Sequence, residues 1–311
     1  MATQMSPFTQ RSLILALAAM AWSVFAPVRA QDADQTFQFT DAAGDVIEAG
    51  VWLPDPPAGV GPRPLVVISH GNGGTYQGHR DTAEALAKAG FVAAALTHPG
   101  DNWRDDSRQT RLTDRPVHVS ALIDHMTREW SGPVGVDRTR VGAFGFSAGG
   151  FTVTALVGGI SDPSRISRHC EEQPQVFACR LIARYPLDTA TWRPSGHDPR
   201  IKAAVIAAPG LGMAFTNESL ARVVVPIQLW QAEADEVLPS PFNVEPIRDR
   251  LGKAPEHHLV AGATHFDFLP ACLPALRAAA PVLCQSQPGF DRTAFHREFN
   301  REVVRFFEDN L

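Results

Sequence analysis

A serine stands between two glycines in the sequence Gly145-Phe-Ser147-Ala-Gly149, which matches the pattern G-x-S-x-G. An apolar run at residues 141–146 precedes the serine, and small and apolar residues follow it at 148–157. This context predicts a strand, a sharp turn and a helix, in which side chains at the two glycine positions would collide with neighbouring backbone. The turn raises the hydroxyl above the sheet edge, and the helix N-terminus favours negative charge beside it. We therefore predict that Ser147 is a nucleophile; the alternative is a glycine-rich turn without a chemical role.

A serine hydroxyl becomes a nucleophile only beside a base, which a third group must orient. After this type of turn the acid comes next in the chain and the histidine last. His265 follows the last predicted strand in a loop of small residues, and Asp235 follows the strand before it. Glu233 and Glu236 are competing carboxylates, and we favour Asp235 because the shorter side chain fits the triad template. His265 would accept the serine proton and pass it to the leaving group, while Asp235 fixes the histidine tautomer.

Negative charge on a tetrahedral intermediate needs preorganised donors, each worth on the order of 3–4 kcal/mol. One expected donor is the backbone N–H of Ala148, directly after the serine. The other is the backbone N–H of Asn72, in the glycine-rich loop Ser69-His-Gly-Asn-Gly-Gly74 that follows a β-branched run. We expect His70, Gly71 and Gly73 to shape this loop rather than to react. The loop matches neither phosphate-binding glycine pattern, which argues against a nucleotide site.

Strand-like and helix-like segments alternate along the chain. Strands are predicted at residues 65–68, 91–96, 141–146, 202–208, 223–230 and 257–260, and helices at 78–89, 116–130, 148–157 and 293–308. The fold class is therefore α/β, with a doubly wound, mostly parallel sheet and right-handed crossovers. An antiparallel hairpin at 36–53 precedes it, and a polar excursion at 161–200 is expected to cover or shape the pocket. Ligands bind at the carboxyl ends of such strands, where the predicted site residues fall.

Composition narrows the class of protein. The chain has 311 residues, 44% of them hydrophobic and 20% charged, which is typical of a soluble globular enzyme. A formal net charge of −5 and the absence of a lysine or arginine run argue against nucleic-acid binding. No metal-ligand cluster is visible in the sequence, and we predict neither metal nor cofactor. Oligomeric state cannot be read from these features.

The first thirty residues resemble a secretion signal. Arg11 precedes an apolar stretch at 13–25, and Val28-Arg29-Ala30 offers small residues where a signal peptidase cuts. The stretch is short for a membrane span, which argues against the alternative of a retained anchor. We predict a signal peptide at 1–30, a single domain at 31–311 and a periplasmic or secreted protein without stable membrane insertion.

Four cysteines fall into two local pairs. In an oxidising compartment we favour the sequential disulfides Cys170–Cys179 and Cys272–Cys284. Buried free thiols are the alternative, since free cysteine is a common core residue.

Taken together, the order of His70-Gly-Asn-Gly-Gly74, Gly-Phe-Ser147-Ala-Gly149, Asp235 and His265 resembles the α/β-hydrolase superfamily. The first two motifs and Thr264-His-Phe-Asp-Phe268 resemble bacterial exported "predicted dienelactone hydrolase" proteins, relatives of the platelet-activating-factor acetylhydrolases. The resemblance covers residues 36–310 and implies hydrolysis of a small-molecule carboxylic ester with a short-chain or polar acyl group. True dienelactone hydrolases carry a cysteine nucleophile where this chain has Ser147, so the family name does not define the substrate.

Two other functions remain open from the sequence. The same residues could attack an amide or peptide bond, although an excursion of about forty residues argues against a large gating domain. A catalytically silent binding protein with this fold is the third possibility, because a fold alone does not prove an activity.

Overall fold

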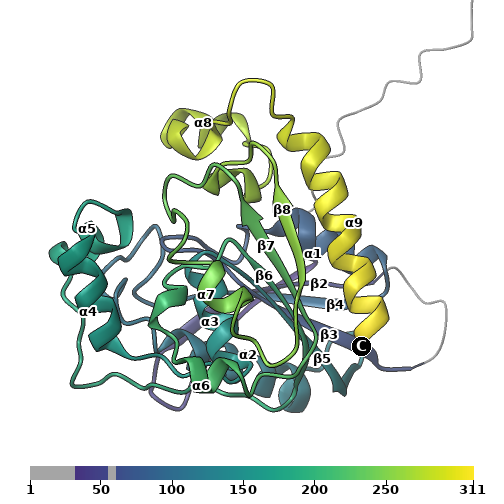
Figure 1. Cartoon of the computed structure of the whole chain (residues 1–311). Helices are drawn as coiled ribbons and strands as arrows, with labels where there is room; N and C mark the ends of the chain where they lie inside the picture. The colour runs from purple at the N-terminus through teal and green to yellow at the C-terminus, as the bar shows by residue number, and fades with distance from the viewer. Residues whose placement is uncertain (1–31, 55–60) are drawn as a thin grey trace, which may run out of the picture. The chain divides into compact units, whose positions relative to one another are not determined.

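The computed structural model describes residues 32–54 and 61–311. Within these ranges eight strands form one sheet in the order β1-β2-β4-β3-β5-β6-β7-β8 (Figure 1). β1 pairs antiparallel with β2, β2 pairs antiparallel with β4, and the remaining neighbours are parallel. The strands are β1 (Gln35–Thr40), β2 (Val46–Trp52), β3 (Arg63–Ser69), β4 (Val92–Thr97), β5 (Val136–Phe146), β6 (Ile201–Ala207), β7 (Ile227–Ala232) and β8 (Glu256–Val260). The predicted doubly wound, mostly parallel sheet with an N-terminal hairpin is confirmed.

The helices lie in the connections between these strands and after the last strand. They are α1 (Arg80–Lys88), α2 (Arg115–Asp124), α3 (Ala148–Leu156), α4 (Pro163–Glu172), α5 (Phe177–Arg184), α6 (Asn217–Leu220), α7 (Glu245–Arg248), α8 (Pro274–Ala279) and α9 (Arg292–Asn310). A π-helical turn, η1 (His125–Glu129), follows α2, and the 3₁₀ turns are η2 (Gly212–Ala214), η3 (His265–Phe268) and η4 (Pro281–Cys284). None of the helices in the described part of the chain has the length and hydropathy to span a bilayer. The predicted signal peptide at 1–30 lies outside the described residues, and the domain division at residue 30 stays a prediction.

The order of the strands brings two loops together. From β3 the chain crosses to β4 on one side, and it then returns to place β5 on the other side of β3. The carboxyl ends of β3 and β5 therefore lie side by side where the winding reverses, which is where open α/β sheets bind ligands. The glycine-rich loop leaves β3 and the serine turn leaves β5, so the topology alone makes them neighbours.

Both faces of the sheet are buried, which explains the continuous apolar strands. Along β3, Leu65 and Val67 pack with side chains of α2 and α3 on one face. Val66 and Ile68 pack with α1 and with the aromatic side of α9 on the other face. The aromatic stripe of the last helix is thus core packing, as its spacing indicates.

The excursion at 161–200 contains more regular structure than its polar sequence suggests. It holds α4 and α5, which lie together on the opposite side of Figure 1 from α9. The disulfide Cys170–Cys179 links the two helices, and Cys272–Cys284 is the second disulfide, so the sequential pairing is confirmed. β7 begins at Ile227 rather than at 223, because Pro226 has no N–H to donate to the ladder.

Candidate active site

Ser147 occupies a strained backbone position between β5 and α3. Its φ is 56° and its ψ is −117°, a region that residues other than glycine seldom adopt. The loop after β6 holds this conformation, since the Ser147 N–H donates to Ala207 O at 3.0 Å and the Ser147 carbonyl accepts from Gly210 N–H at 3.0 Å. The side chain is partly exposed. A strained, supported and accessible serine is the arrangement that the G-x-S-x-G motif predicts.

The two glycines of the motif are required by close backbone contacts. A Cβ on Gly145 would lie 2.1 Å from the Gly149 oxygen. A Cβ on Gly149 would lie 2.0 Å from the Ser69 oxygen, at the end of β3. The turn can therefore pack between β3 and its own strand only without side chains at these positions.

The first expected result follows from this packing. Gly145→Ala should lower the free energy of unfolding by about 1–3 kcal/mol or more, because the backbone of α3 must move to accommodate the methyl group. Gly135→Ala is the matched control, since its Cβ would meet nothing closer than 3.8 Å and should change stability by less than about 0.5 kcal/mol. Urea unfolding of both variants measures the difference. Equal stability of the two variants would contradict the packing argument.

His265 connects Ser147 to Asp235 by two hydrogen bonds. Its Nε2 lies 3.0 Å from Ser147 Oγ, and its Nδ1 lies 2.8 Å from Asp235 Oδ2. The His265 and Asp235 side chains are 2% and 7% exposed. A carboxylate beside Nδ1 requires a proton on that nitrogen, which leaves Nε2 free to accept the serine proton. The structure thus brings the three predicted residues together in the predicted order.

The loop after β7 explains why Asp235, and neither of the competing glutamates, lies beside His265. Asp235 Oδ1 accepts the N–H groups of Val237 at 3.0 Å and Leu238 at 2.7 Å, so its other oxygen faces His265. Glu233 instead accepts from Gly262 N–H at 2.9 Å, and Glu236 is exposed. The chain direction after the strand therefore aims only Asp235 at the histidine.

The glycine-rich loop after β3 passes directly beside the serine. A Cβ on Gly71 would lie 3.2 Å from Ser147 Cβ, and Gly73 has a φ of 69°, which glycine adopts without strain. Ala148 is the first residue of α3, so its N–H has no intrahelical acceptor. Among the described residues, the structure records no acceptor for the Asn72 N–H either. Both predicted donors are therefore available to a bound oxyanion.

His70 orders this loop, as the sequence predicts. Its Nδ1 donates to Gly71 O, and its Nε2 accepts the backbone N–H of His98 at 3.0 Å. Burial, together with the nearby Arg115 guanidinium, holds the pKa of His70 well below its usual range. The imidazole is therefore neutral at pH 7 and fixes the loop through hydrogen bonds.

A buried ion pair that the sequence analysis missed also holds the loop. Asp101 accepts from Asn72 Nδ2 at 2.8 Å and from Gly73 N–H at 2.9 Å. Its other oxygen pairs with Arg115, whose guanidinium also donates to the His70 carbonyl. The two ion-paired side chains are 3% and 2% exposed. The position of Asp101 just beyond the end of β4 could have marked it as a residue near the site, but no local pattern indicates that Arg115 is its partner.

Removing the charge of Asp101 should impair turnover more than binding. We expect Asp101→Asn to lower kcat for an ester substrate by about 10- to 100-fold, because the loop carrying the Asn72 N–H loses its anchor. KM should change by less than about threefold. Asp309→Asn, an exposed position on α9, is the control and should leave both constants unchanged. Steady-state kinetics on folded variants would contradict the anchoring role if kcat of Asp101→Asn stayed at the wild-type value.

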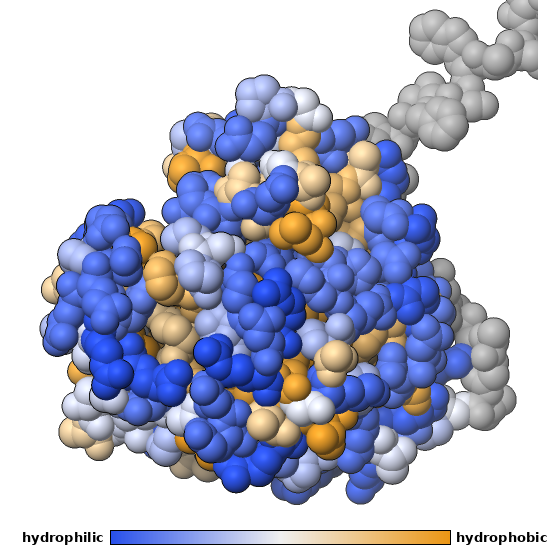
Figure 2. Space-filling view, viewed as in Figure 1, coloured by the Kyte–Doolittle hydropathy of each residue, from blue (hydrophilic) through white to orange (hydrophobic). Residues whose placement is uncertain are grey.

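A cavity of about 10 Å³, room for roughly one water, lies close to the site. It is bounded by Leu211 and Leu238, which flank the turns of Ser147 and Asp235, and by the excursion residues His169, Val176 and Ala178. Figure 2 shows a mostly polar face on which apolar residues appear in small groups, one of them beside α4 and α5. The excursion thus contributes to the walls next to the candidate nucleophile.

Asp41, Asp45 and His118 place possible metal-ligand atoms within 4.8 Å of one another. Arg108 donates to both oxygens of Asp45, at 2.9 and 3.0 Å. Because this guanidinium already supplies the positive charge, the cluster is explained without a cation.

Comparison with solved structures identifies the fold. No family model matches the sequence, and no curated protein matches it. A ferulic acid esterase from Streptomyces cinnamoneus is similar in structure, with a TM-score of 0.59, 19% identity, and coverage of 89% of this chain and 88% of that one. Esterase 2 of Thermogutta terrifontis has a TM-score of 0.56, 17% identity, and coverage of 91% and 97%. A 2,6-dihydroxy-pseudo-oxynicotine hydrolase has a TM-score of 0.55, 13% identity, and coverage of 89% and 68%.

The strand order, the serine turn and these likenesses define an α/β-hydrolase fold. At these identities the likeness shows the fold alone, and the chemistry depends on the residues at this chain's own site.

Proposed function

We propose that the protein is a serine hydrolase that cleaves carboxylic esters through an acyl-enzyme intermediate. The observation that supports this proposal best is the unbroken hydrogen-bonded chain from Ser147 through His265 to Asp235, with distances of 3.0 and 2.8 Å. The esterases and the hydrolase with similar structures support the same reaction class.

The first half of the reaction would form the acyl-enzyme. Ser147 Oγ attacks the ester carbonyl while His265 Nε2 accepts the hydroxyl proton. The negative charge on the carbonyl oxygen is stabilised by the backbone N–H groups of Asn72 and Ala148. His265 then donates its proton to the departing alkoxide, and Asp235 stabilises the imidazolium in between.

The second half would repeat the same steps with water. Water loses a proton to His265 and attacks the acyl carbonyl, and the acid product leaves as Ser147 recovers its proton. A partly exposed serine above buried partners suits this scheme, because water can reach the acyl group while the charged histidine and aspartate stay shielded.

For the substrate we propose a small-molecule ester with a short-chain or polar acyl group. The support for this acyl group is the resemblance of the loop at 70–74 and of the motifs at 145–149 and 264–268 to exported dienelactone hydrolase-like and acetylhydrolase-like proteins. Two disulfides favour an oxidising compartment, so we propose export to the periplasm or the exterior.

Hydrolysis of p-nitrophenyl esters from acetate to octanoate tests the proposal. We expect turnover to be highest for acetate or butyrate and to fall with chain length. Matched p-nitroanilides test the alternative of amide cleavage. Turnover of anilides but not of esters would replace the esterase by an amidase, and turnover of neither would favour a binding protein.

Covalent labelling gives an independent test that needs no knowledge of the natural substrate. A Thermogutta terrifontis esterase with the same fold, at 18% identity and a TM-score of 0.52, is phosphorylated by paraoxon. We expect paraoxon to add one phosphoryl group to this protein, on Ser147, and to abolish ester turnover. Intact-mass and peptide mass spectrometry would contradict the proposal if no adduct forms or if it lies on another residue.

A further inference from the structure

Asp267 is a fully buried carboxylate that the proposed mechanism does not use. It lies in η3, two residues after His265, and is 0% exposed. Its Oδ2 accepts the backbone N–H of Thr264 at 2.8 Å and the Thr264 hydroxyl at 2.9 Å. Thr264 immediately precedes His265, and the side chains of Thr264 and Asp267 form a capping box. The carboxylate therefore closes the turn from which His265 projects.

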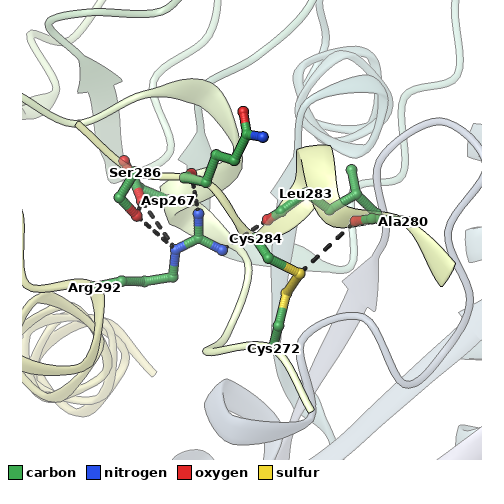
Figure 3. Close-up of a disulfide and its surroundings, with 8 residues drawn as sticks. Asp267, Cys272, Ala280, Leu283, Cys284, Ser286 and Arg292 are labelled. Atoms are coloured by element: carbon green, nitrogen blue, oxygen red, sulfur yellow. Dashed lines mark hydrogen bonds and ion pairs between the residues drawn. A yellow bond between two sulfur atoms is a disulfide. The ribbon is translucent and has the colours of Figure 1, made fainter. Parts of the chain in front are cut away.

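The second oxygen of Asp267 is held from the start of α9. Oδ1 accepts from Arg292 Nε at 2.9 Å and from the Ser286 hydroxyl (Figure 3). Arg292 is itself buried, and its remaining nitrogens donate to Leu283 O at 2.7 Å and Gln285 O at 2.5 Å. Every nitrogen of the guanidinium is thus engaged, which fixes its orientation.

The two carbonyls that bind Arg292 flank a disulfide. Leu283 and Gln285 are the neighbours of Cys284, which is bonded to Cys272 (Figure 3). The disulfide closes the segment that contains α8 and η4, and this segment is mostly exposed. An exposed segment has few packing contacts to define its backbone, so we expect the covalent link to help keep the two carbonyls in place.

α9 provides a second anchor for the same turn. His296 Nε2 lies 2.9 Å from the Asp267 carbonyl oxygen, and His296 Nδ1 lies 2.7 Å from Asp81 Oδ2 in α1. Phe299 and Val303, further along α9, are fully buried in the core. The His265 turn is therefore tied to the rigid side of the sheet.

Burying a carboxylate is costly, and neutral backbone hydrogen bonds could close a turn without one. The ion pair fixes the orientation of the carboxylate, because Thr264 donates to one oxygen of Asp267 and Arg292 donates to the other. His265 needs such support, since it must satisfy Ser147 and Asp235 at the same time, and a shift of about 1 Å can cost about 100-fold in rate.

We propose that Asp267 and Arg292 are positioning residues for His265, and that turnover depends on the Cys272–Cys284 disulfide through the carbonyls that hold Arg292. The inference rests on the proposed function, because it concerns how the proposed base is held. The disulfide is thus tied to the site through a defined chain of contacts, from Cys284 to Arg292, Asp267 and the His265 turn.

The ion pair is tested by Asp267→Asn and Arg292→Lys. Asparagine keeps the shape but presents an N–H where Thr264 or Arg292 also donates, and we expect kcat to fall about 10- to 100-fold with KM within about twofold. Lysine cannot bind the carboxylate and both carbonyls together, so Arg292→Lys should lower kcat. Because lysine keeps the positive charge beside Asp267, Arg292→Lys should still retain more kcat than Arg292→Gln. A merely structural role would lower the melting temperature of these variants and leave kcat of the folded protein unchanged.

The two disulfides form a matched pair of controls. They close loops with sequence separations of 12 and 9 residues, so removing either costs similar stability through the unfolded chain. We expect Cys272→Ser/Cys284→Ser to lower kcat by about 10-fold or more and to weaken the hydrogen bond between His265 and Asp235. Cys170→Ser/Cys179→Ser loosens helices that line the pocket, so it should act mainly on KM and leave that hydrogen bond as in wild type. A wild-type kcat in folded Cys272→Ser/Cys284→Ser would overturn the coupling, whether or not Asp267→Asn folds.

Proton NMR supplies a readout that does not depend on turnover. The Nδ1–H of His265, shared with Asp235, should give a strongly deshielded resonance in wild type, and this resonance should weaken or vanish in Asp267→Asn and Cys272→Ser/Cys284→Ser. If it does so but no ester is cleaved, the positioning stands and the proposed function fails. If esters are cleaved and both kcat and the resonance match wild type in these variants, the proposed function stands and the positioning fails.

Discussion

Ser147→Ala is expected to lower kcat for p-nitrophenyl acetate by about 10⁴- to 10⁶-fold. The substitution removes the oxygen that lies 3.0 Å from His265 Nε2 and leaves the base, the carboxylate and the oxyanion donors in place. Residual activity should remain about 10³-fold above the uncatalysed rate, because the two N–H donors and the bound geometry still favour attack by water. Steady-state kinetics with highly purified protein measures the loss, and paraoxon should add no mass to the variant.

Ser131→Ala is the control, because Ser131 is exposed and lies in the connection before β5. It should match wild type in kcat, KM and paraoxon labelling. Alanine at position 147 inherits the same positive φ as serine, so thermal unfolding of Ser147→Ala should resemble wild type. If folded Ser147→Ala kept more than about a tenth of the wild-type kcat, another nucleophile would have to be sought.

Local sequence was sufficient for the turn that carries Ser147. The requirement for Gly145 and Gly149 comes from contacts between a strand and the helix that follows it directly, and such contacts leave a short motif. The strands were predictable for a similar reason, because burial on both faces makes each one a continuous apolar run. The position of His265 could be predicted because it comes directly after a predicted strand, in a loop of small residues.

The residues that hold the site could not be predicted in this way. Asp101 and Arg115 are adjacent only because β4 and α2 pack beside the glycine-rich loop, and nothing in either local sequence names the partner. Asp267 and Arg292 are 25 residues apart, with a disulfide-closed segment between them. These ion pairs are tertiary contacts between charged side chains, which in a sequence look like ordinary surface charges.

The helices of the excursion were missed for a different physical reason. α4 and α5 have ten and eight residues, lengths at which an isolated helix is marginal in water. Their stability comes from the disulfide Cys170–Cys179 and from buried contacts such as Ile166. Local helix propensity therefore could not predict the structure of this segment, nor which of its residues line the cavity near the site.

The choice of acid gives the second large expected effect, because Asp235→Asn should change the histidine tautomer. The asparagine oxygen can still accept from Val237 and Leu238, which places its NH₂ group opposite His265 Nδ1. Nδ1 must then accept a hydrogen bond, so the imidazole proton moves to Nε2 and faces Ser147. A base that carries a proton where it must accept one is blocked, and we expect kcat to fall about 10⁴-fold with little change in KM.

Glu233→Gln and Glu236→Gln are the matched controls, since each removes one negative charge from the same loop. Glu236 is exposed, and the amide oxygen introduced by Glu233→Gln would still accept the Gly262 N–H, so both variants should keep kcat within about twofold of wild type. A large loss in either of them, with Asp235→Asn near wild type, would transfer the role to a glutamate. Such a result would require the loop after β7 to turn differently, because two backbone N–H groups now direct Asp235 toward His265. A loss confined to Asp235→Asn would instead tie the rate to the tautomer of His265 and not to the charge of the loop.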